Sequence, residues 1–274
     1  MPEVLAKLVD SRCNPLRKPE TILGRSGPRN TRWWPLLLLT VLPAVVAQSV
    51  LPIQSFEARF GVYRYGLALG EAFLTLAVQP EGRYSMRLDI RPNALLSWLF
   101  SEQVEESTFG ELKDGAPRPF GYQRARVGDE PSRVKLSFDW EQERVQAEKN
   151  HRQTSFPLQP RLVDPLSWYL LVMSDLRNGS TPSEYGLVVG DNLKTYQIQR
   201  GGEATIETPL GELTTVMITR QRQGRETAIK LWLAPQLAFL PVQIAKIEQG
   251  EETWRMTIEE LKGIPLPGTP GSVR

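Results

Sequence analysis

Cysteine and histidine are almost absent from this chain of 274 residues. The single cysteine is Cys13, and the single histidine is His151. One cysteine cannot form an internal disulfide, and one histidine cannot supply a multi-histidine metal cluster. His151 lies in a polar turn, where we expect an ordinary surface residue rather than a general base. We therefore expect no metal, no cofactor and no catalytic residue of these two types.

The chain also lacks a strong surplus of either charge, with 33 Lys+Arg against 31 Asp+Glu. Its first 47 residues contain seven of the basic and three of the acidic residues, which leaves 26 and 28 for the remainder. A general nucleic-acid binder carries a basic surplus on its folded part, so nucleic acid is not an expected partner. Local basic residues, Arg124, Arg126, Arg133 and Lys135, are expected on solvated strand faces.

Long apolar runs are rare, and the clearest one is residues 33–47. Arg29 and Arg32 precede this run, and small residues lead to its end at Ala47. The pattern is typical of a signal peptide and predicts cleavage after Ala47 and export to a periplasm of the Gram-negative type. The alternative is an uncleaved segment that anchors the protein in the inner membrane. Residues 1–32 form a polar extension, read either as a cytoplasmic tail or as a start codon assigned too early.

Beyond residue 50, apolar and polar residues alternate in many short segments, as they do in half-buried β-strands. In residues 132–140, for example, Val134, Leu136 and Phe138 share one face. We expect roughly a dozen strands with hairpin-length links, which favours an antiparallel meander. The expected segments are 56–65, 69–79, 84–90, 103–109, 119–127, 132–140, 144–149, 186–190, 194–199, 204–208, 213–220, 227–233, 241–247 and 252–261. Gly201-Gly202 is read as a turn between two of them, and Pro209 and Gly211 as structural residues of a tight hairpin.

One segment, residues 164–178, predicts a long helix. Asp164 is placed to cap its start, Pro165 suits the first helical position, and Gly179 supplies a left-handed stop. The residues between are apolar on nearly every face, which is typical of an enclosed helix. The predicted fold is therefore mainly β: a large curved antiparallel meander or incomplete β-barrel wrapped around this helix. A single β-rich domain is expected over residues 55–262, with a flexible tail over 263–274.

Several motifs, taken in order, resemble a known family. They are Asp164-Pro165-Leu166-Ser167, the helix that ends at Arg177, Glu203-x-x-Ile206-x-Thr208-Pro209-Leu210-Gly211, Trp232-Leu233-Ala234-Pro235 and Leu240-Pro241-Val242. The first half contributes Tyr65-Gly66 and Leu69-Gly70-Glu71-Ala72. Together they resemble the bacterial envelope family of the domain of unknown function DUF3108, over roughly residues 55 to 262. The resemblance implies an exported β-rich domain and transfers no catalytic residue.

Three functions are considered. The first is a non-enzymatic envelope protein that binds an apolar or amphipathic ligand, a lipid or an acyl chain, beside the helix. Its candidate ligand-binding residues are Trp98, Trp168, Tyr169 and Trp232, although such aromatic residues also suit a filled core. The second is a structural module that docks another envelope protein. The third, ranked last, is a hydrolase that uses either carboxylates or a Ser-Lys pair, in which Ser167 would act with a distant lysine, Lys194 or Lys230.

Overall fold

A computed structural model describes residues 52–93, 103–128 and 131–266. All of them belong to one compact unit, residues 48–274. The predicted signal segment 33–47, the extension 1–32 and Trp98 lie outside the described residues, as does most of the tail. Within the described ranges, no helix is long and apolar enough to cross a membrane.

The alternating segments fold into fourteen strands. They are β1 (Phe56–Arg64), β2 (Leu67–Val78), β3 (Arg83–Pro92), β4 (Gln103–Lys113), β5 (Ala116–Val127), β6 (Ser132–Asp139), β7 (Arg144–Lys149), β8 (Arg152–Pro157), β9 (Glu184–Val189), β10 (Asn192–Thr208), β11 (Gly211–Gln221), β12 (Thr227–Ala234), β13 (Leu240–Glu248) and β14 (Glu251–Lys262). A 3-10 turn, η2 (Pro235–Leu237), links β12 to β13.

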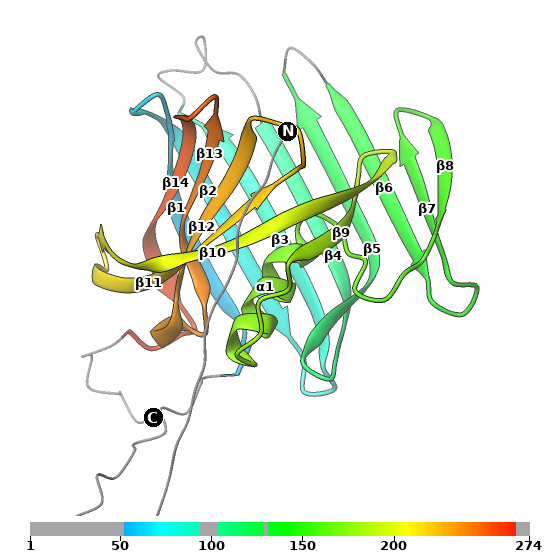
Figure 1. Ribbon diagram of the computed structural model, residues 1–274, viewed down its shortest axis with the longest axis horizontal. Helices are drawn as coiled ribbons and strands as arrows, with labels where there is room; N and C mark the ends of the chain where they lie inside the picture. Colours follow the sequence, from blue (N-terminus) through cyan, green and yellow to red (C-terminus); the bar gives the residue numbers. More distant parts are fainter. Residues whose placement is uncertain (1–51, 94–102, 129–130, 267–274) are drawn as a thin grey trace, which may run out of the picture. The chain divides into compact units, whose positions relative to one another are not determined.

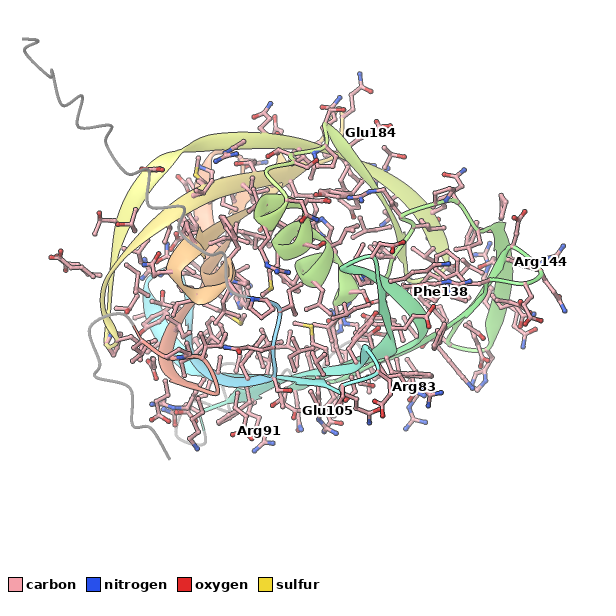
Figure 2. All side chains as sticks on the ribbon, turned by 90° about the horizontal axis from the view of Figure 1, so that it is seen from below. Arg83, Arg91, Glu105, Phe138, Arg144 and Glu184 are labelled. Carbon is pink, nitrogen blue, oxygen red and sulfur yellow. The ribbon has the colours of Figure 1, made fainter. Side chains whose placement is uncertain are left out.

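All fourteen strands join one antiparallel sheet, in the order β8-β7-β6-β5-β4-β3-β2-β1-β14-β13-β12-β11-β10-β9. Neighbours in sequence are neighbours in the sheet, except that β1 pairs with β14, and β8 does not pair with β9. The mainly β, antiparallel meander predicted from the sequence is therefore confirmed. The sheet is open between β8 and β9, and it curves around the one α-helix of the described residues (Figures 1 and 2).

The concave face of the sheet carries the apolar residues. In β6, Val134, Leu136 and Phe138 are buried, whereas Lys135 and Ser137 between them are exposed on the outer face. The same alternation in the other strands places their apolar side chains against the helix, and all of these residues form one core. Packing of this core sets which face of each strand points inward. It therefore also sets which polar side chains near the strand ends point inward.

The helix is shorter than predicted. α1 spans Ser167–Arg177, eleven residues, so the expectation of a long helix over 164–178 is wrong. Val163 pairs with Leu187 of β9 in an isolated parallel bridge, which keeps the chain extended up to that point. The Asp164 carboxylate then accepts hydrogen bonds from the N–H groups two and three residues later, and this turn comes before the helix. The start of the helix is therefore set by a distant strand.

The end of the helix lies close to its predicted position. The N–H of Asn178 donates to Ser174, and Gly179 follows with a φ of 68°. This left-handed conformation suits glycine, which has no Cβ to clash, and it ends the helix. Pro209 lies in the turn between β10 and β11, and Gly211 begins β11 with a φ of 103°.

Two strands differ from their sequence-based prediction. β10 is one strand of 17 residues, where two strands separated by a Gly201-Gly202 turn were expected. The glycines instead form a bulge, because the register with β11 shifts between Arg200 and Glu203 and the strand continues. β8 was not among the expected strands. It pairs with β7 from Arg152 to Pro157 and forms an edge of the sheet.

Candidate functional site

A network of four buried polar side chains attaches the start of α1 to the sheet. The Ser167 hydroxyl donates to Asp164 at 2.6 Å, and the Thr108 hydroxyl of β4 donates to the same carboxylate oxygen at 2.9 Å. Tyr84 of β3 lies 2.9 Å from Ser167, and Thr108 lies 2.8 Å from it. The Ser167 hydroxyl is fully buried, so these contacts make it part of a helix anchor.

Asp164 has no exposed surface, and none of the described cations forms an ion pair with it. Burial raises the pKa of its carboxyl group from 3.8 to about 6, although hydrogen bonds from Ser167 and Thr108 act in the opposite direction. The carboxyl group is thus satisfied by hydrogen-bond donors rather than by charge.

A second anchor holds the other end of the helix. Asp175 accepts hydrogen bonds from the Tyr185 hydroxyl of β9 and from the Arg161 guanidinium. Burial, and then the hydrogen bond to Asp175, raises the pKa of Tyr185. With both ends fixed to the sheet, α1 is a packed part of the interior.

Two of the predicted aromatic ligand-binding residues lie together, and a third lies elsewhere. Trp168 has no exposed surface, and its ring centroid is 5.5 Å from that of Tyr169. Trp232 is half-buried and alternates with the buried Leu231 and Leu233, which places it on the outer face of β12. The structure therefore does not gather these aromatic residues around one cavity.

Arg220 of β11 is a cation held between aromatic rings. Its guanidinium carbon lies 4.1 Å from the Trp168 ring centroid and 4.7 Å from that of Tyr196. Its Nε is buried without a hydrogen-bond partner, as is Nε1 of Trp168. Burial lowers the pKa of Arg220. Within the described residues, Arg220 forms no ion pair with a carboxylate.

A hollow of about 240 Å³, which we call the inner hollow, lies where the ends of β5, β6 and β7 face the β9–β10 turn. Apolar atoms of its wall come from Tyr122, Val134, Pro165 and Val189. The remaining lining residues are Arg124, Arg126, Ser132, Lys149, Gly190, Asn192 and Lys194. Four of these are cations, and none of the described residues in the lining is a carboxylate.

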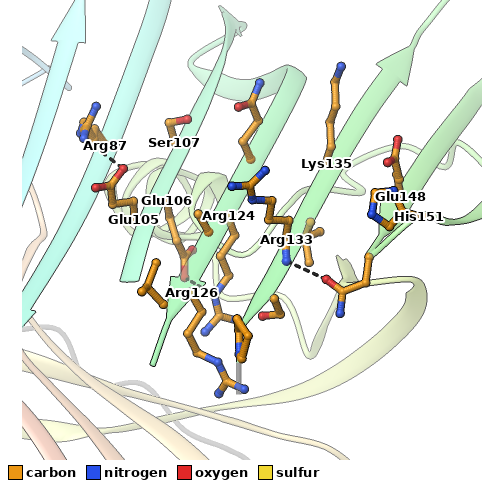
Figure 3. A pocket seen from close by; sticks show the side chains of 17 residues that line it. Arg87, Glu105, Glu106, Ser107, Arg124, Arg126, Arg133, Lys135, Glu148 and His151 are labelled. Carbon is orange, nitrogen blue, oxygen red and sulfur yellow. Dashed lines mark hydrogen bonds and ion pairs between the residues drawn. The ribbon is translucent and has the colours of Figure 1, made fainter. Parts of the chain in front are cut away.

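A larger hollow of about 920 Å³, the outer hollow, lies over β3 to β7 (Figure 3). It carries both charges, since Arg87 lies 3.5 Å from Glu105 and Arg124 lies 3.2 Å from Glu106. It shares Arg124, Arg126, Ser132 and Val134 with the inner hollow, so the two adjoin at the ends of β5 and β6. In the part of the chain that the structure describes, no cluster of three or more His, Cys, Asp or Glu side chains is arranged to hold a metal.

Comparison with known proteins places the chain in a family. The family model described as protein of unknown function, DUF3108, matches residues 55–257. The chain belongs to this family. The match lies within the range over which the sequence motifs resembled it, and it spans every strand of the sheet from β1 into β14.

One solved structure supports the β-barrel-like fold of this DUF3108 domain. A β-barrel-like protein of another domain of unknown function, DUF1849, from Brucella abortus is similar with a TM-score of 0.51 and 10% identity. The match covers 77% of this chain and 98% of that one. The MucA/MucB complex from Pseudomonas aeruginosa matches with a TM-score of 0.34 and 13% identity, over 80% of this chain and 53% of that one. A search of the curated proteins found no match.

Sequence reasoning missed the residues that line the inner hollow of the DUF3108 domain. Arg124 and Arg126 were expected on a solvated face, yet they share the inward parity of the buried Tyr122 on β5. That parity was visible in the sequence and is the signal that identifies them. Lys149 and Lys194 gave no such signal, because 44 intervening residues and a helix separate them before the fold brings them to one hollow.

Proposed function

We propose that this DUF3108 domain is a non-enzymatic binding protein of the bacterial envelope that takes up an amphipathic ligand, a lipid or an acyl chain. Export to the periplasm is part of the proposal, and the signal-peptide pattern of residues 33–47 supports it. The single observation that carries the ligand class is the lining of the inner hollow, which combines apolar side chains with cations.

The size of the inner hollow limits how the ligand is held. Pockets that enclose a whole small molecule measure about 300–1,000 Å³, and the inner hollow, at about 240 Å³, is smaller. Trp168 and its neighbours fill the space deeper along α1. The hollow therefore takes one end of a ligand, and the rest of the ligand extends over the open end of the sheet.

Filling the hollow tests the proposal. Ser132→Trp places a large side chain in the lining, whereas Ser137→Trp adds the same group to the outer face of the same strand. With a lipid extract at a hundredfold excess over Kd, the melting temperature of the wild type and of Ser137→Trp should rise by about 5–10 °C. Ser132→Trp should show no rise. Native mass spectrometry of protein purified from the periplasm provides a second measurement. If no lipid co-purifies and no extract shifts the wild-type melting temperature, the proposal is wrong.

A second candidate is a module that docks another envelope protein, and the outer hollow favours it. Its charged side chains of both signs come from five strands and suit a complementary protein surface. A photo-crosslinking residue at Lys135, inside this hollow, should then yield one discrete adduct in cells. The same residue at Lys262, which is exposed at the end of β14, is the control and should yield none. Equal adducts from both positions would contradict this candidate.

A further inference from the structure

We propose that the inner hollow recognises the anionic group, a phosphate or a carboxylate, of its ligand through Lys194, Lys149 and Arg124. The inference rests on the proposed function and deepens it, because it states which end of the amphipathic ligand enters the hollow. It depends on the placement of cations, on what already pairs with them and on the apolar wall beside them.

Lys194 is the clearest candidate contact. It is half-buried on β10, lines the inner hollow and forms no ion pair with a described carboxylate. Burial lowers its pKa, and the nearby positive charges of Arg222 and Lys149 lower it further, while Asp191 opposes them. Cations that face each other without enough carboxylates disfavour the ligand-free state, and a bound anion relieves that repulsion.

Lys149 and Arg124 are only partly satisfied within the protein. Lys149 Nζ lies 3.9 Å from Asp191, a carboxylate that also lies 3.7 Å from Arg152. Arg124 Nε lies 3.2 Å from Glu106 but outside hydrogen-bond geometry. An ammonium group has three N–H donors and a guanidinium has five, so both side chains keep donors for an anion.

The Glu106 carboxylate is already engaged on its other oxygen. That oxygen accepts a hydrogen bond from the Tyr122 hydroxyl at 2.9 Å. One carboxylate is therefore shared between Arg124 and a phenol, and it also influences the pKa of Arg220. The positive charge near the hollow exceeds what Glu106 and Asp191 balance among the described residues.

Arg220 is a further buried cation of the interior, and it is not among the residues that line the inner hollow. It stacks on Tyr196, which lies two residues from Lys194 on β10 and so shares its inward face. Aromatic rings hold this buried cation, and they do not neutralise its charge as a carboxylate would. The charge is also screened less in the low-dielectric interior than it would be in water.

The test compares lipids that differ only in the headgroup. Wild-type protein is titrated with short-chain phosphatidylglycerol and with diacylglycerol of the same acyl chains, which has no phosphate, and separately with inorganic phosphate. We expect phosphatidylglycerol to bind about tenfold or more tightly than diacylglycerol, because a charge-assisted hydrogen bond to an ionised group exceeds a neutral one by about this factor.

Three variants assign the effect to the inner hollow. Lys194→Gln should lose about tenfold in affinity for phosphatidylglycerol and little for diacylglycerol, and Lys194→Arg should retain the preference. Lys262→Gln makes the same charge change at the exposed end of β14, outside both hollows, and should bind like the wild type. The melting temperature without ligand shows whether each variant is folded.

The outcomes separate this inference from the proposed function. If both lipids bind equally well, with and without Lys194, the amphipathic-ligand function stands and anion recognition is overturned. If inorganic phosphate alone binds in a Lys194-dependent way and no lipid does, anion recognition stands and the lipid function is overturned. If no probe binds, both are overturned.

Discussion

At the residue scale, the buried carboxyl group of Asp164 accepts hydrogen bonds from neighbouring donors and forms no ion pair with a described cation. Its pKa is about 6 in the folded protein and near 3.8 otherwise, so the folded state binds this proton more tightly than the unfolded state. The resulting stabilisation is fully present below a pH of about 3.8 and is lost as the pH rises through about 6. Asp164→Asn keeps an acceptor oxygen for the helix N–H groups and has no charge to bury. Relative to this variant, the wild-type free energy of unfolding should fall by about 2.5 kcal/mol between a pH of about 4 and about 7.

Urea denaturation at several pH values measures this difference. Thr108→Val is the matched control, since it removes one hydrogen bond to the carboxylate and leaves the charge in place. It should lower stability by about 1 kcal/mol above a pH of about 6, where the carboxylate is ionised, and by less at low pH, so the fall in stability with rising pH should be at least as large as in the wild type. If the free energy of unfolding changes with pH in the same way for the wild type and Asp164→Asn, the Asp164 carboxyl group does not bind its proton more tightly in the folded protein.

At the element scale, the sequence predicts those features of helices and strands that depend on residues close together in the chain. Most strands were located because alternation with a period of two is a local pattern, and Ser132–Asp139 is the clearest case. The interior of the helix was located by its apolar residues. Its start was not, because the bridge between Val163 and Leu187 is a contact with a strand that follows the helix. The bulge at Gly201-Gly202 has the same cause: glycine pairs mark turns and bulges alike, and β11 decides between them.

The residues of the candidate site also divide into those that a local sequence pattern identifies and those that only the fold brings together. The aromatic residues of α1 are recognisable in the sequence as large and enclosed, and Trp168 is buried. The grouping of Lys149 with Lys194 depends on how the β6–β7 hairpin faces the β9–β10 turn across the open sheet. No local pattern encodes that approach, so a search for catalytic or aromatic motifs does not find the cationic lining of the inner hollow.

At the scale of the whole molecule, the two ends of the domain meet in the middle of the sheet. β1 pairs with both β2 and β14, whereas β8 and β9 each have one strand neighbour. Arg59 of β1 reinforces this central seam through ion pairs with Glu71 at 2.9 Å and Glu260 at 2.7 Å. The free edge of β9 is partly covered by the Val163 bridge. The edge of β8 is thus the exposed one among the described strands.

This arrangement predicts a gradient of hydrogen exchange across the sheet. Amides of β8 should exchange at least about tenfold faster than those of β1 and β14, because opening an edge strand of six residues breaks one ladder and exposes little apolar surface. β7 is the internal control, since it also has six residues but pairs on both sides, and its amides should exchange more slowly than those of β8. Exchange followed by mass spectrometry of peptides over residues 56–64, 144–149, 152–157 and 251–262 measures the order. Protection of β8 equal to that of β1 would contradict an open sheet, because it requires a pairing partner along the β8 edge in solution. The open end of the sheet, over which we propose that the ligand extends, would then be closed on that side.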